Sequence, residues 1–168
     1  KRQQEGITKA DIVLDKLHRG VRNSLNQYNS SNRDGMDISL CVIDKQANTV
    51  EFAGAMNSLV YIQNGELKRL IGDKVPIGGE QREANRKFYS HTIDISIPTT
   101  LYLYSDGYQD QFGGKDNRKF MAPRFRKLLH SIHQKPMAEQ KTMLESTLDN
   151  WQQDNEQLDD ILVIGVQV

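Results

Sequence analysis

The order of the secondary-structure signals is the feature that most restricts the fold of this chain. One amphipathic helical pattern comes first, a series of short strand-like segments follows, and helical spacing returns in the last third. A parallel doubly wound sheet needs strands and helices that alternate, and this sequence lacks that alternation. The order therefore predicts an α+β fold, in which mainly antiparallel strands are layered with helices.

The first helical pattern begins near Thr8. Thr8 and Asp11 have the spacing of a capping box, in which side chains bind the free backbone amides of a helix start. Apolar residues then recur at helical spacing as far as Gln27, which predicts one buried face. The residues of this predicted face are Ile12, Leu14, Leu17, Val21 and Leu25.

Apolar and branched residues form short runs in the middle of the chain, and turn residues separate them. Asn64-Gly65 is the strongest turn signal, because both central positions of a tight hairpin must accept positive φ. Residues 72–81 contain one proline and three glycines, which predicts an irregular loop. The predicted strands are residues 36–43, 49–53, 59–63, 66–71, 88–95 and 100–104.

Two helices and a final strand are predicted after these strands. Apolar spacing between Phe125 and Ile132 indicates the first helix, and Pro136 opens the second where its missing amide has no cost. Residues 161–168 are almost wholly apolar, so we expect a strand that is buried on both faces or central in a sheet. The expected buried side of the second helix comprises Met137, Gln140, Leu144, Leu148 and Trp151.

Composition limits the classes of function. Twenty-two basic and 22 acidic residues cancel, so no long-range field favours binding to nucleic acid or to an anionic membrane. The single cysteine, Cys41, excludes an internal disulfide and a cysteine-based zinc site, and its apolar neighbours predict a buried thiol. No apolar stretch is long enough to span a bilayer. We therefore expect a cytoplasmic domain.

Two acidic segments adjoin predicted strands. Asp106-Gly107 follows the strand 100–104, and Asp159-Asp160 precedes the strand 161–168. A carboxylate at a rigid strand end is a good ligand for a hard cation, because its position is set before the ion binds. Either segment alone is also typical of an ordinary turn or a solvated loop. Together, with Gly107 allowing a sharp turn, they make a metal site a hypothesis.

Five segments in the same order resemble motifs of the SpoIIE-like branch of the metal-dependent (PP2C) serine/threonine phosphatases. Residues 104–114 resemble the branch's Asp-Gly signature, and residues 157–161 resemble its closing motif with paired aspartates. The resemblance covers residues 8–168. The other three segments are residues 36–38, 52–57 and 76–78.

This resemblance implies an αββα sandwich whose two sheets hold two Mn²⁺ or Mg²⁺ ions. On that pattern Asp106 is a shared metal ligand, Asp159 is a ligand of one ion, Asp160 supports these ligands, and Gly107 lets the backbone approach the metal-bound water. Asp106 and Asp159 are thereby implied to be the catalytic residues. The implied reaction is hydrolysis of phosphoserine or phosphothreonine in a protein by a metal-activated water. The implied substrate is a signalling phosphoprotein, such as an anti-sigma-factor antagonist.

The branch also has an earlier aspartate-bearing strand and a Gly-His-Gly turn, and neither occurs in this sequence. We therefore interpret residues 1–168 as the C-terminal portion of such a phosphatase domain, with sensory domains upstream in the same protein. We expect this portion alone to lack part of the metal site, to be inactive, and to associate into a homodimer through unpaired strands. Arg33 and Arg82, in predicted loops, are candidates for phosphate binding.

Two alternatives stay open at this point. The first is a degenerate sensor or interaction module that keeps the sandwich and has lost the metals and the activity. The second is a calcium-binding module built on Asp106, Asp110 and Asp116, which the spacing disfavours because ligands in such loops alternate.

Overall fold

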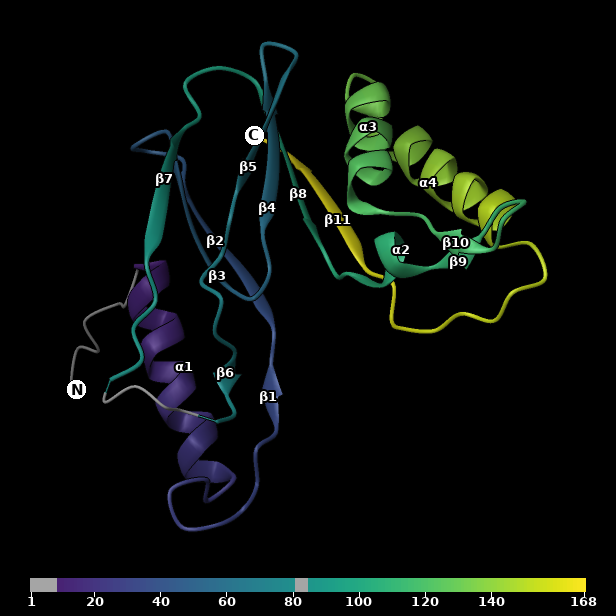
Figure 1. Ribbon diagram of the computed structural model, residues 1–168. Helices are drawn as coiled ribbons and strands as arrows, with labels where there is room; N and C mark the ends of the chain where they lie inside the picture. Colours follow the sequence, from purple (N-terminus) through teal and green to yellow (C-terminus); the bar gives the residue numbers. More distant parts are fainter. Residues whose placement is uncertain (1–8, 81–84) are drawn as a thin grey trace. The chain divides into compact units, whose positions relative to one another are not determined.

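The computed structural model describes residues 9–80 and 85–168. They form an α+β fold of antiparallel sheets and helices, which confirms the predicted fold class (Figure 1). The chain divides into two units, one comprising the chain up to Leu59 with Arg69–Ile97, the other comprising Val60–Lys68 with Pro98–Val168. Each unit has its own hydrophobic core. In the described part of the chain, no helix combines the length and apolar character needed to cross a membrane.

The first unit starts with helix α1 (Ala10–Ser24), which buries a row of residues spaced four apart. This row differs from the predicted face, because the side chains of Ile12 and Leu25 are 39% and 40% exposed. Leu14 belongs both to the predicted face and to the buried row. Leu17 and Val21 are partly buried and pack against the hydrophobic core. The buried row is Ala10, Leu14, His18 and Arg22.

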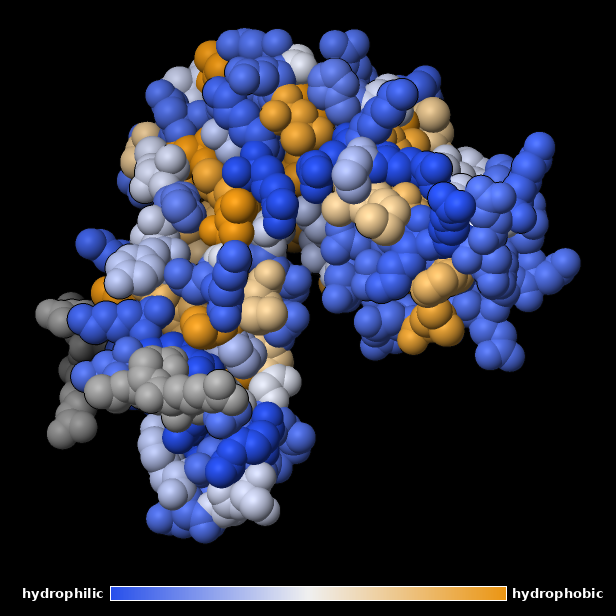
Figure 2. Space-filling model, viewed as in Figure 1, coloured by the Kyte–Doolittle hydropathy of each residue, from blue (hydrophilic) through white to orange (hydrophobic). Residues whose placement is uncertain are grey.

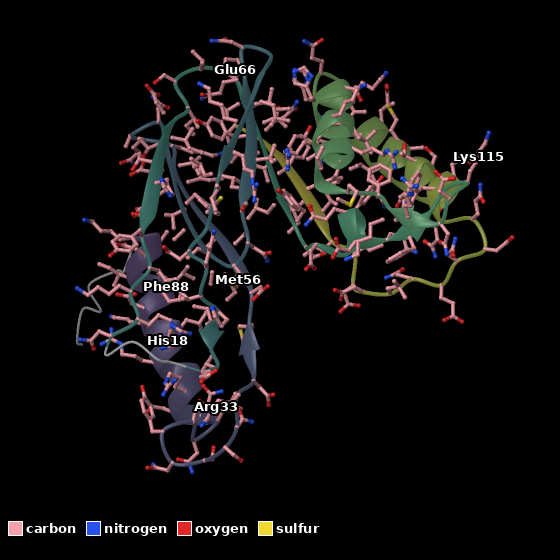
Figure 3. The ribbon with its side chains drawn as sticks, in the orientation of Figure 1. His18, Arg33, Met56, Glu66, Phe88 and Lys115 are labelled. Carbon is pink, nitrogen blue, oxygen red and sulfur yellow. The ribbon has the colours of Figure 1, made fainter. Side chains whose placement is uncertain are left out.

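Two polar residues belong to this row because they bind backbone groups of a neighbouring loop. The amide of Gly78 donates to Nδ1 of His18 at 3.0 Å, and Nη1 of Arg22 donates to the carbonyl of Gly79 at 2.9 Å. The ring of His18 also lies edge-on to Phe88, with 6.2 Å between centroids (Figure 3). These bonds offset part of the cost of burying the two polar side chains, although Nε of Arg22 is buried without a hydrogen-bond partner among the described residues.

The start of α1 differs from the predicted capping box. Thr8 lies outside the described residues, and the N-cap residue is Lys9, whose side chain makes no capping hydrogen bond. The carboxylate of Asp11 accepts from the amide of the next residue, Ile12, at 2.8 Å. It binds no earlier amide among the described residues, so the predicted capping box is not found in them.

A three-stranded antiparallel sheet of order β2-β3-β7 accompanies α1. The predicted turn between the first two strands is confirmed, because Asp44 Oδ1 accepts from the amides of Gln46 and Ala47 at 2.9 and 3.0 Å. Cys41, on β2, is only half-buried, which corrects the prediction of a buried residue, although burial raises the pKa of its thiol to about 11. The strands are β2 (Ile38–Asp44), β3 (Thr49–Ala55) and β7 (Ser90–Asp94).

A short ladder corrects the prediction of a wholly irregular loop at residues 72–81. Strand β6 (Ile77–Gly78) in this segment pairs antiparallel with β1 (Gly35–Met36). The predicted strand 36–43 is accordingly divided into β1 and β2. The ladder contains only two residue pairs. Hydrophobic periodicity in the sequence cannot identify so short a strand.

The second unit contains a four-stranded sheet of order β11-β8-β4-β5. Asn64 and Gly65, between β4 and β5, have φ of 50° and 75°, as the predicted hairpin turn requires. Strands β8 and β11 pair antiparallel over five residue pairs, from Val163 opposite Tyr104 to Gln167 opposite Thr100. The strands are β4 (Leu59–Gln63), β5 (Glu66–Leu70), β8 (Thr99–Tyr104) and β11 (Val163–Gln167).

Strand β11 corrects the expectation of a strand that is central or buried on both faces. It ends the strand order of its sheet, and the side chains of Leu162 and Ile164 are 56% and 45% exposed. Hydrophilic residues cover most of the face shown in Figure 2, where hydrophobic residues gather only in small groups. An apolar run indicates a strand, but its position within a sheet depends on which partners are present.

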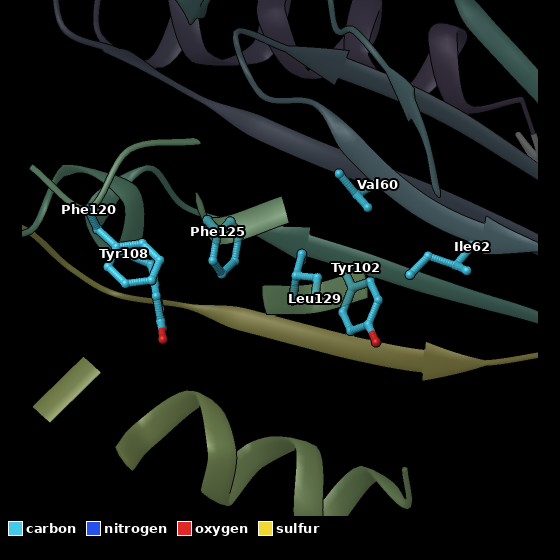
Figure 4. Packing of buried hydrophobic residues seen from close by; sticks show 7 residues of the cluster. All are labelled: Val60, Ile62, Tyr102, Tyr108, Phe120, Phe125 and Leu129. Carbon is cyan, nitrogen blue, oxygen red and sulfur yellow. The ribbon is translucent and has the colours of Figure 1, made fainter. Parts of the chain in front are cut away.

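Helices and a short hairpin complete the second unit. Both helices predicted in the last third are present as α3 and α4, whereas the one-turn helix α2 and the hairpin β9–β10 had no clear sequence signal. The hydrophobic core joins the sheet to α2 and α3 through seven buried residues, shown in Figure 4: Val60, Ile62, Tyr102, Tyr108, Phe120, Phe125 and Leu129. The elements are α2 (Gly107–Asp110), β9 (Phe112–Gly113), β10 (Arg118–Lys119), α3 (Ala122–Ile132) and α4 (Met137–Gln152).

Candidate metal centre

The first acidic segment stands where β8 leaves the core. The strand is mostly buried, and the chain turns at Asp106 into α2, whose first residue is Gly107. The side chain of Asp106 is exposed, and among residues 9–80 and 85–168 it has no hydrogen-bond or ion-pair partner. A carboxylate fixed to a strand end and free of protein partners is available to a cation.

Ser105 joins this strand end to the second acidic segment. Its hydroxyl donates to the carbonyl of Asp160 at 2.7 Å and accepts from the amide of Leu162 at 2.9 Å. The amide of Ser105 also donates to the carbonyl of Leu162 at 3.0 Å. These bonds continue the β8–β11 pairing and hold the main chain at Asp160 beside the turn at Asp106.

Gly107 brings the two segments closer than any other residue would allow. A Cβ placed on Gly107 would lie 2.4 Å from the carbonyl oxygen of Asp160, well inside van der Waals contact. The small space between the two backbones therefore explains the glycine after Asp106. Sequence reasoning attributed it to a sharp turn and an approach to water.

The second acidic segment is an exposed loop held by its own hydrogen bonds. Oδ1 of Asp159 accepts from the amide of Asp160 at 2.7 Å, and Nε2 of Gln157 donates to the carbonyl of Asp159 at 2.8 Å. Both carboxylates are exposed. The structure thus brings the main chain of Asp160, and with it the adjacent Asp159, to the Asp106–Gly107 turn.

The oxygen donors at this site are of the kind that a hard divalent cation binds. There are too few of them among the described residues, however, to complete the coordination shell of an ion. Mg²⁺ and Mn²⁺ favour carboxylate, carbonyl and water oxygens, which are the atoms exposed here. Within the described residues, however, no group of three or more His, Cys, Asp or Glu side chains is arranged to hold an ion. Asp106, Asp159 and Asp160 can therefore supply part of a metal site.

The other sequence candidates lie elsewhere or have partners. Nη1 of Arg33 donates to the carbonyls of Ser30 and Asn32, and Arg82 lies outside the described residues. Asp110 pairs with Lys119 at 2.9 Å, and no group of three acidic side chains in the described residues is arranged to hold an ion, which disfavours the calcium-loop alternative. Arg33 has no hydrogen bond or ion pair to the candidate centre among the described residues.

Two residues that support the centre were missed by sequence reasoning. Ser105 provides the bridge described above. Gln111, a buried residue after α2, donates through Nε2 to the carbonyl of Glu156 at 2.9 Å and so holds the loop that leads to Asp159. In a single sequence, nothing indicates which distant carbonyl a serine or glutamine will bind. Sequence patterns therefore could not identify these two residues.

Comparisons with known proteins identify the family and the fold of this chain. The sequence matches the family model of Stage II sporulation protein E (SpoIIE) over residues 4–168. No relative was found among curated protein sequences. The SiaA-PP2C domain of Pseudomonas aeruginosa has a similar structure, with a TM-score of 0.84, 26% identity, and coverage of 98% of this chain. This chain spans 63% of that domain's chain, which is less than two thirds of it.

Two further structures share the fold at lower identity. The SpoIIE phosphatase domain from Bacillus subtilis, in a form presoaked with Mn, has a TM-score of 0.62 and 14% identity, with 99% of this chain and 75% of that chain covered. RsbX in complex with magnesium has a TM-score of 0.54 and 13% identity, with 93% and 71% covered. The family match spans nearly the whole sequence and the fold agrees with it, so this chain belongs to the SpoIIE family and has a PP2C-type phosphatase fold.

Proposed function

We propose that this chain is part of a metal-dependent domain that removes phosphate from phosphoserine and phosphothreonine in proteins of bacterial signalling. Family membership and the PP2C fold support a serine/threonine phosphatase domain. The observation that carries the proposal is the junction of the two acidic segments through Ser105 and Gly107. Two related structures, the Mn-presoaked SpoIIE phosphatase domain and RsbX in complex with magnesium, support a divalent ion.

Each residue of the centre has a role in this proposal. Asp106 and Asp159 would hold the metal, with Asp106 as the shared ligand, and Asp160 and Gly107 would shape the adjoining backbone. Mn²⁺ or Mg²⁺ held there would supply an activated water and stabilise the charge on the phosphoryl oxygens. The Ser105 bonds hold in place the backbone that carries Asp106 and Asp160, so less of the site has to be ordered when an ion binds.

Residues 9–80 and 85–168 provide few ligands for such a reaction. A two-ion mechanism needs several fixed oxygens around each ion, and the described part of the chain contains no cluster of three ligating side chains. We therefore propose that the chain by itself binds metal weakly and turns over phosphoprotein slowly. The same observation favours the second candidate function, a non-catalytic sensor or interaction module with this fold.

Replacing Asp106 by Asn in the complete parent protein tests the enzyme proposal. The change removes one negative charge and keeps the shape of the side chain, so metal affinity and turnover should fall together, by at least about a hundredfold. Hydrolysis of a phosphoserine peptide, measured as Mn²⁺ is titrated, gives both quantities. Thermal unfolding without metal should be nearly unchanged.

Asp154→Asn is the matched control, because Asp154 is also an exposed aspartate of the loop after α4 and has no proposed ligand role. It should leave activity within about twofold of the original protein, as surface changes usually do. Equal activity in the Asp106→Asn protein would remove Asp106 from the mechanism. A complete parent protein with no metal-dependent hydrolysis would instead favour the non-catalytic module.

The partner and location follow as further proposals. The substrate would be a phosphorylated protein of the anti-sigma-factor antagonist type, and the domain would work in the cytoplasm. The balanced charge of 22 basic and 22 acidic residues supports a protein partner over a nucleic acid.

A further inference from the structure

A recess in the second unit lies outside the candidate metal centre. It has a volume of about 610 Å³ and is formed by the β9–β10 hairpin, the start of α3 and one residue of α4, Trp151. None of its lining residues belongs to the acidic segments at Asp106 or Asp159. Lys115 lies at the hairpin turn (Figure 3). The proposed function therefore does not use this recess.

The recess is rich in positive charge, although the net charge of the whole chain is zero. Four of its lining residues are basic and one, Asp116, is acidic, whereas the whole sequence has a formal net charge of zero. Asp116 pairs with Arg118 at 3.9 Å, and Lys119 pairs with Asp110, outside the lining, at 2.9 Å. The four basic residues are Lys115, Arg118, Lys119 and Arg124.

Two of these positive charges are not neutralised. Within the described part of the chain, Lys115 and Arg124 have no carboxylate partner. The N-terminus of helix α3 adds positive potential at the recess. The first turn of this helix contains no acidic residue, and its N-cap residue, Met121, makes no side-chain capping bond. No carboxylate in the first turn therefore neutralises the positive end of the helix dipole.

Arg124 is held in a defined orientation. Its guanidinium carbon lies 4.2 Å from the ring centroid of Trp151 and 5.4 Å from that of Phe120. Trp151 is itself fixed, because its indole nitrogen donates to the carbonyl of Gln111 at 3.0 Å. A guanidinium stacked on an aromatic face keeps its N–H groups in plane, where they can bind a carboxylate with two parallel hydrogen bonds.

We propose that this recess binds an acidic segment of a partner protein, with carboxylates of the segment on Arg124 and Lys115. A volume of this size accommodates a few side chains of an extended peptide. A nucleic acid is a poorer match, because it needs a longer basic surface along its backbone, and this chain has no net positive charge. The ligand class is thus a short, glutamate- or aspartate-rich peptide.

Fluorescence anisotropy with the purified 168-residue chain tests the proposal. The probe is a short fluorescein-labelled peptide rich in glutamate, and its partner probe has glutamine at the same positions. We expect the glutamate peptide to bind at least about tenfold more tightly, and its affinity to fall as salt is raised. Arg124→Gln should weaken binding about tenfold, and Lys115→Gln should weaken it severalfold.

Arg126→Gln is the matched control, because Arg126 is on the same helix but does not line the recess. It should change the affinity by less than about twofold. Lys115 is on an exposed turn, so its variant reports on binding even if Arg124→Gln destabilises the fold. Equal binding of the two peptides, equal losses in the Arg124 and Arg126 variants, or tighter binding of a single-stranded DNA probe would overturn the proposal. The assay requires no phosphatase activity, so its failure would leave the proposed function standing.

Discussion

At Gly107 the main chain comes so close to Asp160 that no side chain fits between them. The added Cβ would meet the carbonyl oxygen of Asp160 at 2.4 Å and the carbonyl carbon at 2.9 Å. Both are backbone atoms, which cannot turn away as the end of a flexible side chain can. At the scale of single residues, the candidate metal centre therefore depends on a missing side chain at Gly107 as well as on the carboxylates beside it.

Gly107→Ala should separate the two acidic segments. We expect a loss of about 1–3 kcal/mol in the free energy of unfolding, because the main chain must shift to admit the methyl group. Urea denaturation of the 168-residue chain measures it. Gly20→Ala is the control, since nothing lies within 4 Å of its added Cβ and the residue is inside α1. That change should stabilise the protein by about 0.5–1 kcal/mol, and an equal loss in both variants would contradict the packing argument.

At the scale of secondary-structure elements, one buried amide connects three parts of the second unit. Gln140 of α4 accepts from the hydroxyl of Tyr102 on β8 at 2.7 Å. Its Nε2 donates to the carbonyls of His133 and Lys135, at 3.2 and 2.7 Å, where the chain leaves α3. The side chain thus satisfies a helix terminus and a buried hydroxyl together. Sequence spacing placed Gln140 correctly on the buried side of α4.

Gln140→Ala should destabilise the protein by about 2–4 kcal/mol, because it leaves buried polar groups unpaired and opens a cavity. Chemical denaturation followed by Trp151 fluorescence measures the change. Glu139→Ala, on the same helix turn, is the control, since Glu139 is exposed and pairs with Lys135 only at the surface. Its effect should stay within about 0.5 kcal/mol. A Gln140 variant as stable as this control would show that the buried bonds contribute little.

At the scale of the whole molecule, strand β11 ends its sheet and has exposed apolar side chains. Within the described residues, only β8 pairs with it, so its other edge presents backbone donors and acceptors. Exposed edges with apolar residues favour pairing between chains. The homodimer expected from the sequence stays a prediction, and β11 is the element that we propose for it.

Sedimentation velocity should show that the 168-residue chain associates, and that Ile164→Lys shifts it toward the monomer. Lysine on an edge strand opposes pairing by charge and by desolvation. Ile12→Lys is the control, because Ile12 is an exposed apolar residue that belongs to a helix and not to a strand. Association that responds equally to both changes, or a chain that is monomeric without either, would remove β11 as the interface.

Much of the fold was predictable from the sequence. Turn chemistry at Asn64-Gly65, helical spacing before Ile132 and the order of the elements each depend on neighbours a few residues away, and each prediction was confirmed. The buried row of α1 was predicted less well, because His18 and Arg22 are buried only through bonds to Gly78 and Gly79, far along the chain.

For the candidate metal centre too, some features were predictable from the sequence and others were not. The sequence by itself determined the two acidic segments, because a strand that ends in a carboxylate is a local pattern. Only the tertiary structure decided how they meet, since the Ser105 bond to Asp160 and the close approach of Gly107 join residues more than fifty positions apart. The edge position of β11 was decided there too, because the neighbours of a strand are set by the assembled sheet and not by its own side chains.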